Sequence, residues 1–246
     1  MKKIAFILAS LLIPGWLMAS EGHVHLEKAN VNLADQASLQ KGARTFVNYC
    51  LNCHAASFMR YSRMAKDLGL SEEEVTKNLM FASAKIGEPM NVAMPRNEVK
   101  KWFGTVPPDL SVITRARGED WIYTYLKSFY LDPSRPTGVN NLVFKDVGMP
   151  HVLWELQGYA EPVFAEAHAG EGAAHKTVVG TKVVKPGLQT PEKYDETVHD
   201  LVNFLTYVGE PSKLDRLHLG PWVMLFLALF AGLAYLLKKE FWRDIH

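Results

Sequence analysis

Cys50, Cys53 and His54 are the residues whose types and spacing best suit chemistry, because they form a Cys-x-x-Cys-His motif from the only two cysteines in 246 residues. This motif is typical of covalent haem attachment. Cysteines three residues apart lie about one helical turn apart on the same side. Both can therefore form thioether bonds to a porphyrin edge while the histidine reaches the iron.

Three other uses of the cysteine pair stay open from the residues alone: a thioredoxin-like dithiol, half of a zinc site, or one structural disulfide. Zinc would need two more ligands, which only scattered histidines could supply. Nothing around the motif resembles a thioredoxin βαβ unit. The sequence therefore favours haem.

The axial position opposite His54 would decide what such a haem does. A methionine there gives an electron carrier of raised potential, a histidine gives a lower potential, and an open position suits ligand binding or catalysis. The candidate sulfur donors are Met80, Met90, Met94 and Met149. Met94 and Met149 each precede a proline in an irregular segment, so the residues alone leave a near tie, with Met149 slightly favoured by its long loop.

The elements that must position these residues are mainly helical. From Asp35, the apolar residues Leu39, Ala43 and Phe46 recur on one helical face that leads to Cys50. Further helices are expected at 71–84, beginning with a capping box at Ser71, at 119–130 and at 190–209. Segments 87–109 and 133–150 are expected to be loops, and a small hairpin is expected around Gly180-Thr181.

The chain begins with a pattern typical of an export signal. Lys2 and Lys3 precede an apolar run that is too short to span a bilayer, and Pro14-Gly15 and a small-residue site follow. Residues 1–19 are therefore predicted to be a signal peptide cleaved after Ala19, in preference to an uncleaved anchor. The body would then be exported.

A second apolar run, residues 219–237, is long enough to cross a bilayer. Basic residues flank both ends, with a slight excess after the run, so the positive-inside rule leans weakly toward a cytoplasmic C-terminus. The export signal gives the same orientation. The predicted organisation is a periplasmic domain at 20–218, a transmembrane helix at 219–237 and a cytoplasmic tail at 238–246.

Composition is consistent with this plan. The formal net charge of the chain is +1, which gives no reason to expect a nucleic-acid partner. Without signal and span, about 200 residues remain, enough for one domain with a sizeable core. The predicted fold class is mainly α: a cytochrome c-like helical haem domain with long loops and a small β-hairpin, plus one C-terminal transmembrane helix.

The order of motifs along the chain resembles the cytochrome c1 family of bacterial type. Cys-x-x-Cys-His is followed by four shorter motifs: Val106-Pro107-Pro108-Asp109-Leu110-Ser111, Arg115-Ala116-Arg117-Gly118-Glu119-Asp120, Pro136-Thr137-Gly138 and Val147-Gly148-Met149-Pro150. An amphipathic helix and a span ending in Lys-Lys-Glu come after them. The resemblance covers almost all of the mature chain. Only the segment between Gly158 and Thr190, with His168 and His175, matches no family motif.

The resemblance implies roles for particular residues. It makes Met149 the sixth iron ligand, because Met149 follows the Arg-Ala-Arg and Pro-Thr-Gly motifs, whereas Met94 precedes the Pro-Pro-Asp-Leu motif. It makes Arg115 the expected partner of a haem propionate, with Arg117 second, since an arginine fork neutralises a carboxylate by paired hydrogen bonds. Pro107 and Pro108 are expected to wall the haem pocket.

The implied function is one-electron relay through one covalently attached haem c. The chain would be the haem subunit of ubiquinol:cytochrome c oxidoreductase in a bacterial inner membrane. It would take electrons from a Rieske iron–sulfur subunit beside cytochrome b and pass them to a cytochrome c-type acceptor, with no substrate chemistry of its own. The alternatives are a free-standing membrane-anchored monohaem carrier and, from another class, a haem peroxidase.

Overall fold

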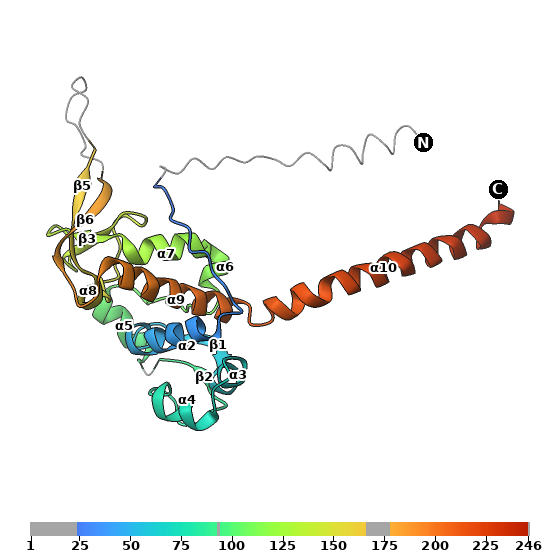
Figure 1. Cartoon of the computed structure of the whole chain (residues 1–246), viewed down its shortest axis with the longest axis horizontal. Coiled ribbons are helices and arrows are strands. Elements are labelled where there is room, and N and C mark those ends of the chain that lie inside the picture. The colour runs from blue at the N-terminus through green and yellow to red at the C-terminus, as the bar shows by residue number, and fades with distance from the viewer. Residues whose placement is uncertain (1–23, 93, 166–177, 246) are drawn as a thin grey trace, which may run out of the picture.

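The computed structural model describes residues 24–92, 94–165 and 178–245, and in these ranges the chain is mainly helical (Figure 1). The helices are α2 (Gln36–Thr45), the π-helical turn η1 (Phe46–Cys50), α3 (Tyr61–Asp67), α4 (Glu72–Asn78), α5 (Arg96–Phe103), α6 (Ile113–Arg117), α7 (Glu119–Lys127), α8 (Trp154–Gln157), α9 (Pro191–Gly209), α10 (Lys213–Phe241) and the 3-10 turn η2 (Arg243–Ile245). The strands form the antiparallel pairs β1 (Ala56–Arg60) with β2 (Pro89–Met90), β3 (Phe129–Leu131) with β4 (Val139–Asn141), and β5 (Gly158–Phe164) with β6 (Val178–Pro186). The predicted fold class is confirmed.

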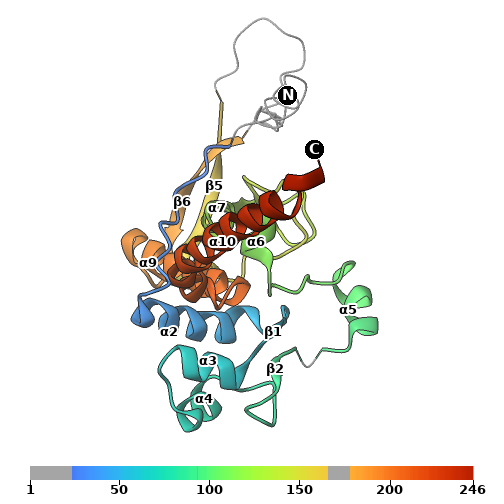
Figure 2. The same cartoon turned by 90° about the vertical axis from the view of Figure 1, so that its right-hand side faces the viewer.

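The core is built around the contact between α2 and α9, which lie side by side in Figures 1 and 2. Both helices bury a face of apolar side chains, and the rings of Phe46 and Phe204 lie 5.7 Å apart. Gly42 allows the backbones to meet, because a Cβ atom placed there would lie 2.0 Å from the carbonyl oxygen of Asp200. The helix that ends at Cys50 is therefore held rigidly against the last helix of the domain.

The helices α2, α4 and α9 begin where the capping residues in the sequence predict them to begin. The Asp35 side chain accepts a hydrogen bond from the Ser38 amide, and Ser71 and Glu74 form the predicted capping box. Thr190 caps α9, whose first residue is Pro191. The prediction that α4 reaches residue 84 is wrong: it ends at Asn78, because the next residues, Leu79 and Met80, turn into the core.

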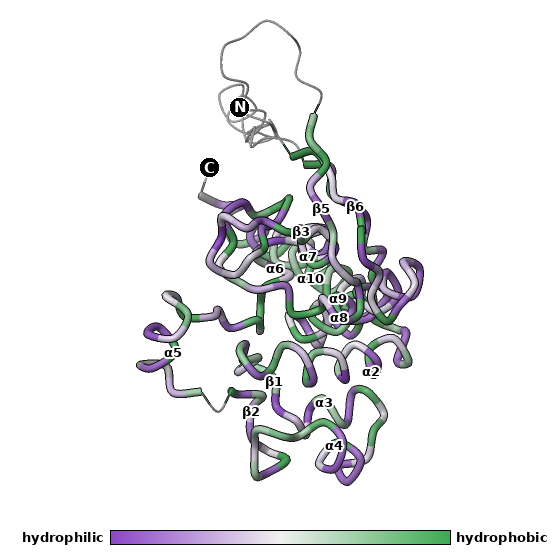
Figure 3. The backbone as a smooth tube through the Cα atoms, turned by 90° about the vertical axis from the view of Figure 1, so that its left-hand side faces the viewer, coloured by the Kyte–Doolittle hydropathy of each residue, from purple (hydrophilic) through white to green (hydrophobic). Residues whose placement is uncertain are grey.

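The two segments expected to be loops contain regular structure. Segment 87–109 contains α5, which begins after Pro95 and ends at Phe103, and Gly104 follows with a φ of +73° as a left-handed cap. Figures 2 and 3 show α5 standing apart from α2 and α9. Segment 133–150 contains β4, and its partner β3 replaces the last residues of the helix predicted to reach 130. Pairing with β4, which follows β3 after a short connection, overrides helix periodicity there.

The predicted hairpin around Gly180-Thr181 is also wrong, because β6 runs without a turn through these residues and pairs with β5. The strands form a ribbon that projects from the body (Figure 1). His168 and His175, between them, lie outside the described residues, as does the predicted signal peptide 1–19.

Helix α10 contains the predicted span 219–237 and extends beyond it at both ends, for 29 residues in all. It leaves the domain as a separate rod, and none of its most apolar window is buried against the other residues that the structure describes (Figure 1). A fully exposed apolar helix of this length is suited to a lipid environment.

Candidate functional site

The Cys-x-x-Cys-His segment is a tight continuation of the first helix. The Leu51 amide donates to the Phe46 carbonyl at 2.9 Å, and the His54 amide donates to the Cys50 carbonyl at 2.8 Å. Cys50, Cys53 and His54 are thus presented on consecutive turns of one rigid element. Cys50 is buried and Cys53 is half-buried, and both are free thiols, so the disulfide alternative is not adopted.

The surroundings of the thiols do not favour a redox dithiol. Burial and the neighbouring Cys53 raise the pKa of Cys50 to about 12, and burial raises the pKa of Cys53. Reactive dithiols have a thiol pKa below the ordinary value. The zinc alternative lacks ligands as well, since within residues 24–92, 94–165 and 178–245 no three His, Cys, Asp or Glu side chains are grouped to hold a metal.

His54 is oriented for coordination by its contact with Pro108. Its Nδ1 atom lies 2.8 Å from the Pro108 carbonyl oxygen. Because a carbonyl can only accept, Nδ1 must carry the proton, which leaves the lone pair of Nε2 free for a metal. Burial lowers the pKa of His54, against smaller opposing effects of Pro108 and Asp109. The lowered pKa favours the neutral imidazole, and the contact with Pro108 favours the tautomer with a free Nε2.

The Pro107-Pro108 segment is fixed in turn by Asp109. The Asp109 carboxylate accepts hydrogen bonds from the Ser57 amide at 3.1 Å and hydroxyl at 2.5 Å, and from the Ser111 amide at 2.8 Å. The Leu110 amide also donates to the Ala55 carbonyl at 2.8 Å. These bonds join the Pro-Pro wall to the chain just after His54, so the Pro108 carbonyl has little freedom to move.

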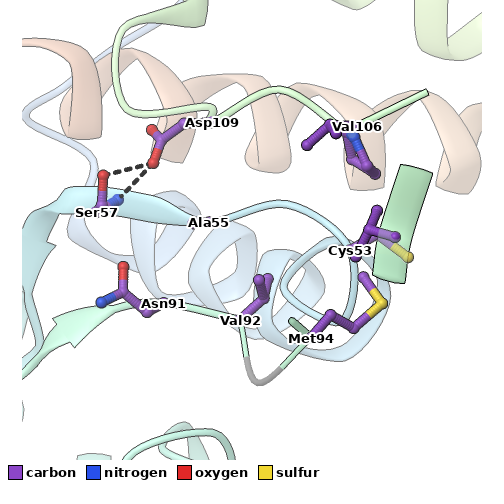
Figure 4. Close-up of a pocket in the computed structure, with 10 residues that line it drawn as sticks. Cys53, Ala55, Ser57, Asn91, Val92, Met94, Val106 and Asp109 are labelled. Carbon is purple, nitrogen blue, oxygen red and sulfur yellow. Dashed lines mark hydrogen bonds between the residues drawn. The ribbon is translucent and has the colours of Figure 1, made fainter. Parts of the chain in front are cut away.

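A cavity of about 340 Å³ lies beside Cys53 (Figure 4). Its lining residues are Cys53, Ala55, Ser57, Asn91, Val92, Met94, Val99, Val106, Pro107 and Asp109. In Figure 4 the sulfur atoms of Cys53 and Met94 lie on the same side of the cavity. Of the motif, only Cys53 lines this cavity, whose walls are partly apolar and partly polar. Two free thiols, an imidazole with Nε2 available and this cavity beside Cys53 fit the requirements of a covalently held haem.

The four candidate methionines have different surroundings. Met80 and Met90 are buried in the core and act as apolar filling. Met94 lines the cavity, whereas Met149 is not among its lining residues. The Met149 sulfur instead accepts a hydrogen bond from the Tyr125 hydroxyl at 3.3 Å. Sequence reasoning did not find Tyr125 as a site residue, since its partner is 24 residues away.

The two candidate arginines lie in different places. Arg115 lines a second cavity, of about 370 Å³, together with Glu210 and Lys213 near the start of α10. The Arg117 guanidinium lies 5.2 Å from the ring centroid of Trp121. Trp121 in turn stacks on Tyr125 with a centroid distance of 5.0 Å. Arg117 is the last residue of α6, and its contact with Trp121 of α7 crosses the break at Gly118. Contacts therefore join Arg117 to Met149 through Trp121 and Tyr125.

Comparisons with known proteins identify the family of this chain. Residues 27–245 match the model of the Cytochrome C1 family. The chain is 52% identical to the cytochrome c1 of Allochromatium vinosum over the full length of both chains. It is 49% identical, again over both full lengths, to a Nitrosomonas europaea protein named ammonia monooxygenase gamma subunit. A chain of a solved hyperthermophilic respiratory complex III aligns over 100% of this chain and 98% of its own length, at 15% identity and a TM-score of 0.45.

Proposed function

Because the chain belongs to the cytochrome c1 family, we propose that it holds one covalent haem c and passes single electrons from a Rieske iron–sulfur subunit to a cytochrome c-type acceptor. The family carries haem, and its members are the membrane-anchored electron-transfer subunit of respiratory complex III, ubiquinol:cytochrome c oxidoreductase. The observation that carries the proposal is the pair formed by His54 Nδ1 and the Pro108 carbonyl at 2.8 Å, which leaves Nε2 for iron.

The residues of this chain have distinct tasks in the relay. Cys50 and Cys53 would form the two thioether bonds, and His54 would be the axial ligand on the same side. Pro107, which lines the cavity, and Pro108, which contacts His54, would form the wall of the haem pocket, and Asp109 would keep that wall in place. When bound, the haem supplies an iron centre that changes charge by one electron. The chain itself breaks no bond of an organic substrate.

Met149 is the proposed sixth ligand, on the order of motifs in the family. Its partly buried side chain packs on the cluster of Phe129, Val139 and Val147, which holds the loop between β4 and α8. Met94 is the competing donor, because it lines the cavity beside Cys53. The two methionines make a matched pair for mutation.

The ligand test uses the purified native complex. Met149→Leu should abolish the sulfur-to-iron charge-transfer absorption band and lower the midpoint potential, since a thioether ligand raises the potential of a c-type haem. Met94→Leu, which removes the same group, should leave the band unchanged. A band that survives in Met149→Leu and disappears in Met94→Leu would transfer the role to Met94.

Arg115 and Arg117 both remain proposals for a propionate partner. We favour Arg117, because its guanidinium lies over Trp121, and Trp121 stacks on Tyr125, the hydrogen-bond donor to Met149. Arg115 instead neighbours Glu210, whose pKa is lowered chiefly by a hydrogen bond from Arg216 and in part by the charge of Arg115. The charge of Arg115 is therefore already partly balanced by the Glu210 carboxylate, which makes Arg115 the second choice for a propionate.

The proposed location is a bacterial inner membrane, with α10 as a single span, the haem domain in the periplasm and the C-terminus in the cytoplasm. Among the described residues, none packs on the apolar window of α10, which supports a lipid-facing helix. The proposed partners are cytochrome b, the Rieske subunit and the cytochrome c-type acceptor. Affinity purification of the tagged chain from solubilised membranes should recover cytochrome b and the Rieske protein.

The same purification, followed by carbon monoxide binding to the purified protein, separates the alternatives. A free-standing carrier would be recovered alone, and a haem peroxidase would bind carbon monoxide readily in its reduced native state. Recovery with ammonia monooxygenase subunits would instead assign the chain to the system named for its Nitrosomonas relative. Family membership favours complex III over these outcomes.

A further inference from the structure

The Tyr125 hydroxyl has a specific partner, the thioether sulfur of Met149, at 3.3 Å. The hydroxyl is the donor, because a thioether can only accept. A phenol has an ordinary pKa of about 10, so the hydroxyl carries its proton at physiological pH. The contact is therefore a persistent hydrogen bond from O–H to sulfur. A methionine that only filled an apolar pocket would not need this bond.

The ring of Tyr125 is held so that its hydroxyl has one direction available. Trp121 stacks on one side at 5.0 Å and 9°, and Phe129 meets it edge-on at 5.1 Å and 68°. The backbone carbonyl of Tyr125 also accepts a hydrogen bond from the Asn141 side chain at 2.8 Å. The donor is thus positioned by both its ring and its main chain.

The acceptor is held by the same group of residues. Val147, two residues before Met149, is buried against Phe129, and His151, two residues after it, stacks on Phe129 at 4.9 Å and 5°. Phe129 therefore anchors both sides of the Met149 loop and the ring of Tyr125. The distance between hydroxyl and sulfur is set by this shared support.

We propose that Tyr125 is a positioning residue that tunes the haem potential, by donating a hydrogen bond to the Met149 sulfur. The inference rests on the proposed function, in which Met149 is the sixth ligand. A thioether sulfur has two lone pairs, so one can accept from Tyr125 while the other faces iron. The hydrogen bond withdraws electron density from the sulfur, which makes it a weaker donor and favours the reduced state of the iron.

The test compares Tyr125→Phe with Tyr123→Phe in the purified native complex. Tyr123→Phe is the matched control, because Tyr123 is a buried tyrosine of the same helix whose hydroxyl contacts Lys127 rather than Met149. Tyr125→Phe keeps the ring and its stacking, and removes only the donor. At a fixed redox poise, the ratio of oxidised to reduced haem should rise about threefold in Tyr125→Phe, a potential lower by ~28 mV at 59 mV per tenfold. Tyr123→Phe should leave that ratio unchanged.

A second variant reverses the sign. Site-specific incorporation of 3-fluorotyrosine at position 125 makes the phenol a stronger donor, so the haem should become easier to reduce than in the native protein. The position of the sulfur-to-iron band should shift in opposite directions in the two variants. A purely structural role of Tyr125 would give no such reversal.

The outcomes separate this inference from the proposed ligand. If Met149→Leu abolishes the band while Tyr125→Phe and the fluorinated variant leave the potential unchanged, Tyr125 has no tuning role and the ligand assignment stands. If Met149→Leu leaves the band intact, the ligand assignment fails and the role of Tyr125 is overturned with it. Haem content and thermal unfolding of each variant identify any variant that has lost its fold.

Discussion

The close approach of α2 and α9 at Gly42 leads to a prediction that can be worked through in numbers. In Gly42→Ala, the new Cβ atom would lie 2.0 Å from the Asp200 carbonyl oxygen and 2.7 Å from the Cβ of Phe204. The helices must separate by roughly 1.5 Å to restore van der Waals contact. The obstacle is main chain, so a rotamer change cannot relieve it.

Two effects of opposite sign set the expected change in the free energy of unfolding of Gly42→Ala. Overpacking costs typically 1–3 kcal/mol, and a backbone obstacle places this site near ~3 kcal/mol. Alanine gains about 1 kcal/mol over glycine inside a helix. The net loss in the free energy of unfolding is then about 2 kcal/mol, which lowers Tm by roughly 4–8 °C for a domain of this size.

Thermal unfolding of the haem-loaded protein, followed by circular dichroism in the haem absorption region, measures this loss. Gly87→Ala is the control, because a Cβ atom at Gly87 meets nothing within 4 Å. Its Tm should stay within about 2 °C of the native value or rise slightly. A Gly42→Ala protein as stable as the native one would mean that helix propensity dominates and that the two backbones are not in contact.

Two further variants test the supports of the site. The fully buried side chain of Asn203 accepts a hydrogen bond from the backbone amide of Asn32 at 3.0 Å and donates one to the Asn32 carbonyl at 2.9 Å. Asn203→Ala removes both bonds, so the free energy of unfolding should fall by about 2–3 kcal/mol. Unchanged amide hydrogen exchange at Asn32 would contradict this. Burial raises the pKa of Asp109, but hydrogen bonds from Ser111 and Ser57 outweigh it and the net pKa is lowered. The stability that Asp109 adds is therefore present above the ordinary carboxyl pKa of about 4 and is lost as the pH falls below it. Urea unfolding at pH 5 and pH 3 should show a smaller acid loss in Asp109→Asn than in the native protein, and equal losses would refute the role of this carboxylate.

Local patterns predicted much of the helical framework. The face of Leu39, Ala43 and Phe46, the capping box at Ser71 and the Thr190-Pro191 start all lie where they were expected. These signals succeed because capping and helix periodicity involve residues within about one or two turns of each other. The α5 helix was missed although Pro95 and Gly104, a usual start and stop, bracket it.

The strand pairings were not predictable in the same way. β3 pairs with residues of a proline- and glycine-containing segment, and β5 and β6 are separated in sequence by residues 165–177. Each pairing joins strands across an intervening segment, and its register depends on hydrogen bonds that no single segment encodes. Predictions based on single segments therefore gave a helix end that is too long and a hairpin in the wrong place.

For the site, the sequence by itself determined the chemistry that Cys50, Cys53 and His54 can perform, because their spacing places them on consecutive turns of one element. Only the tertiary structure decided the tautomer of His54, the different surroundings of Arg115 and Arg117, and the contact of Tyr125 with Met149. The physical reason is distance along the chain. The Pro108 carbonyl lies 54 residues from His54, and Met149 lies 24 residues from Tyr125, so packing of the whole domain brings these partners together.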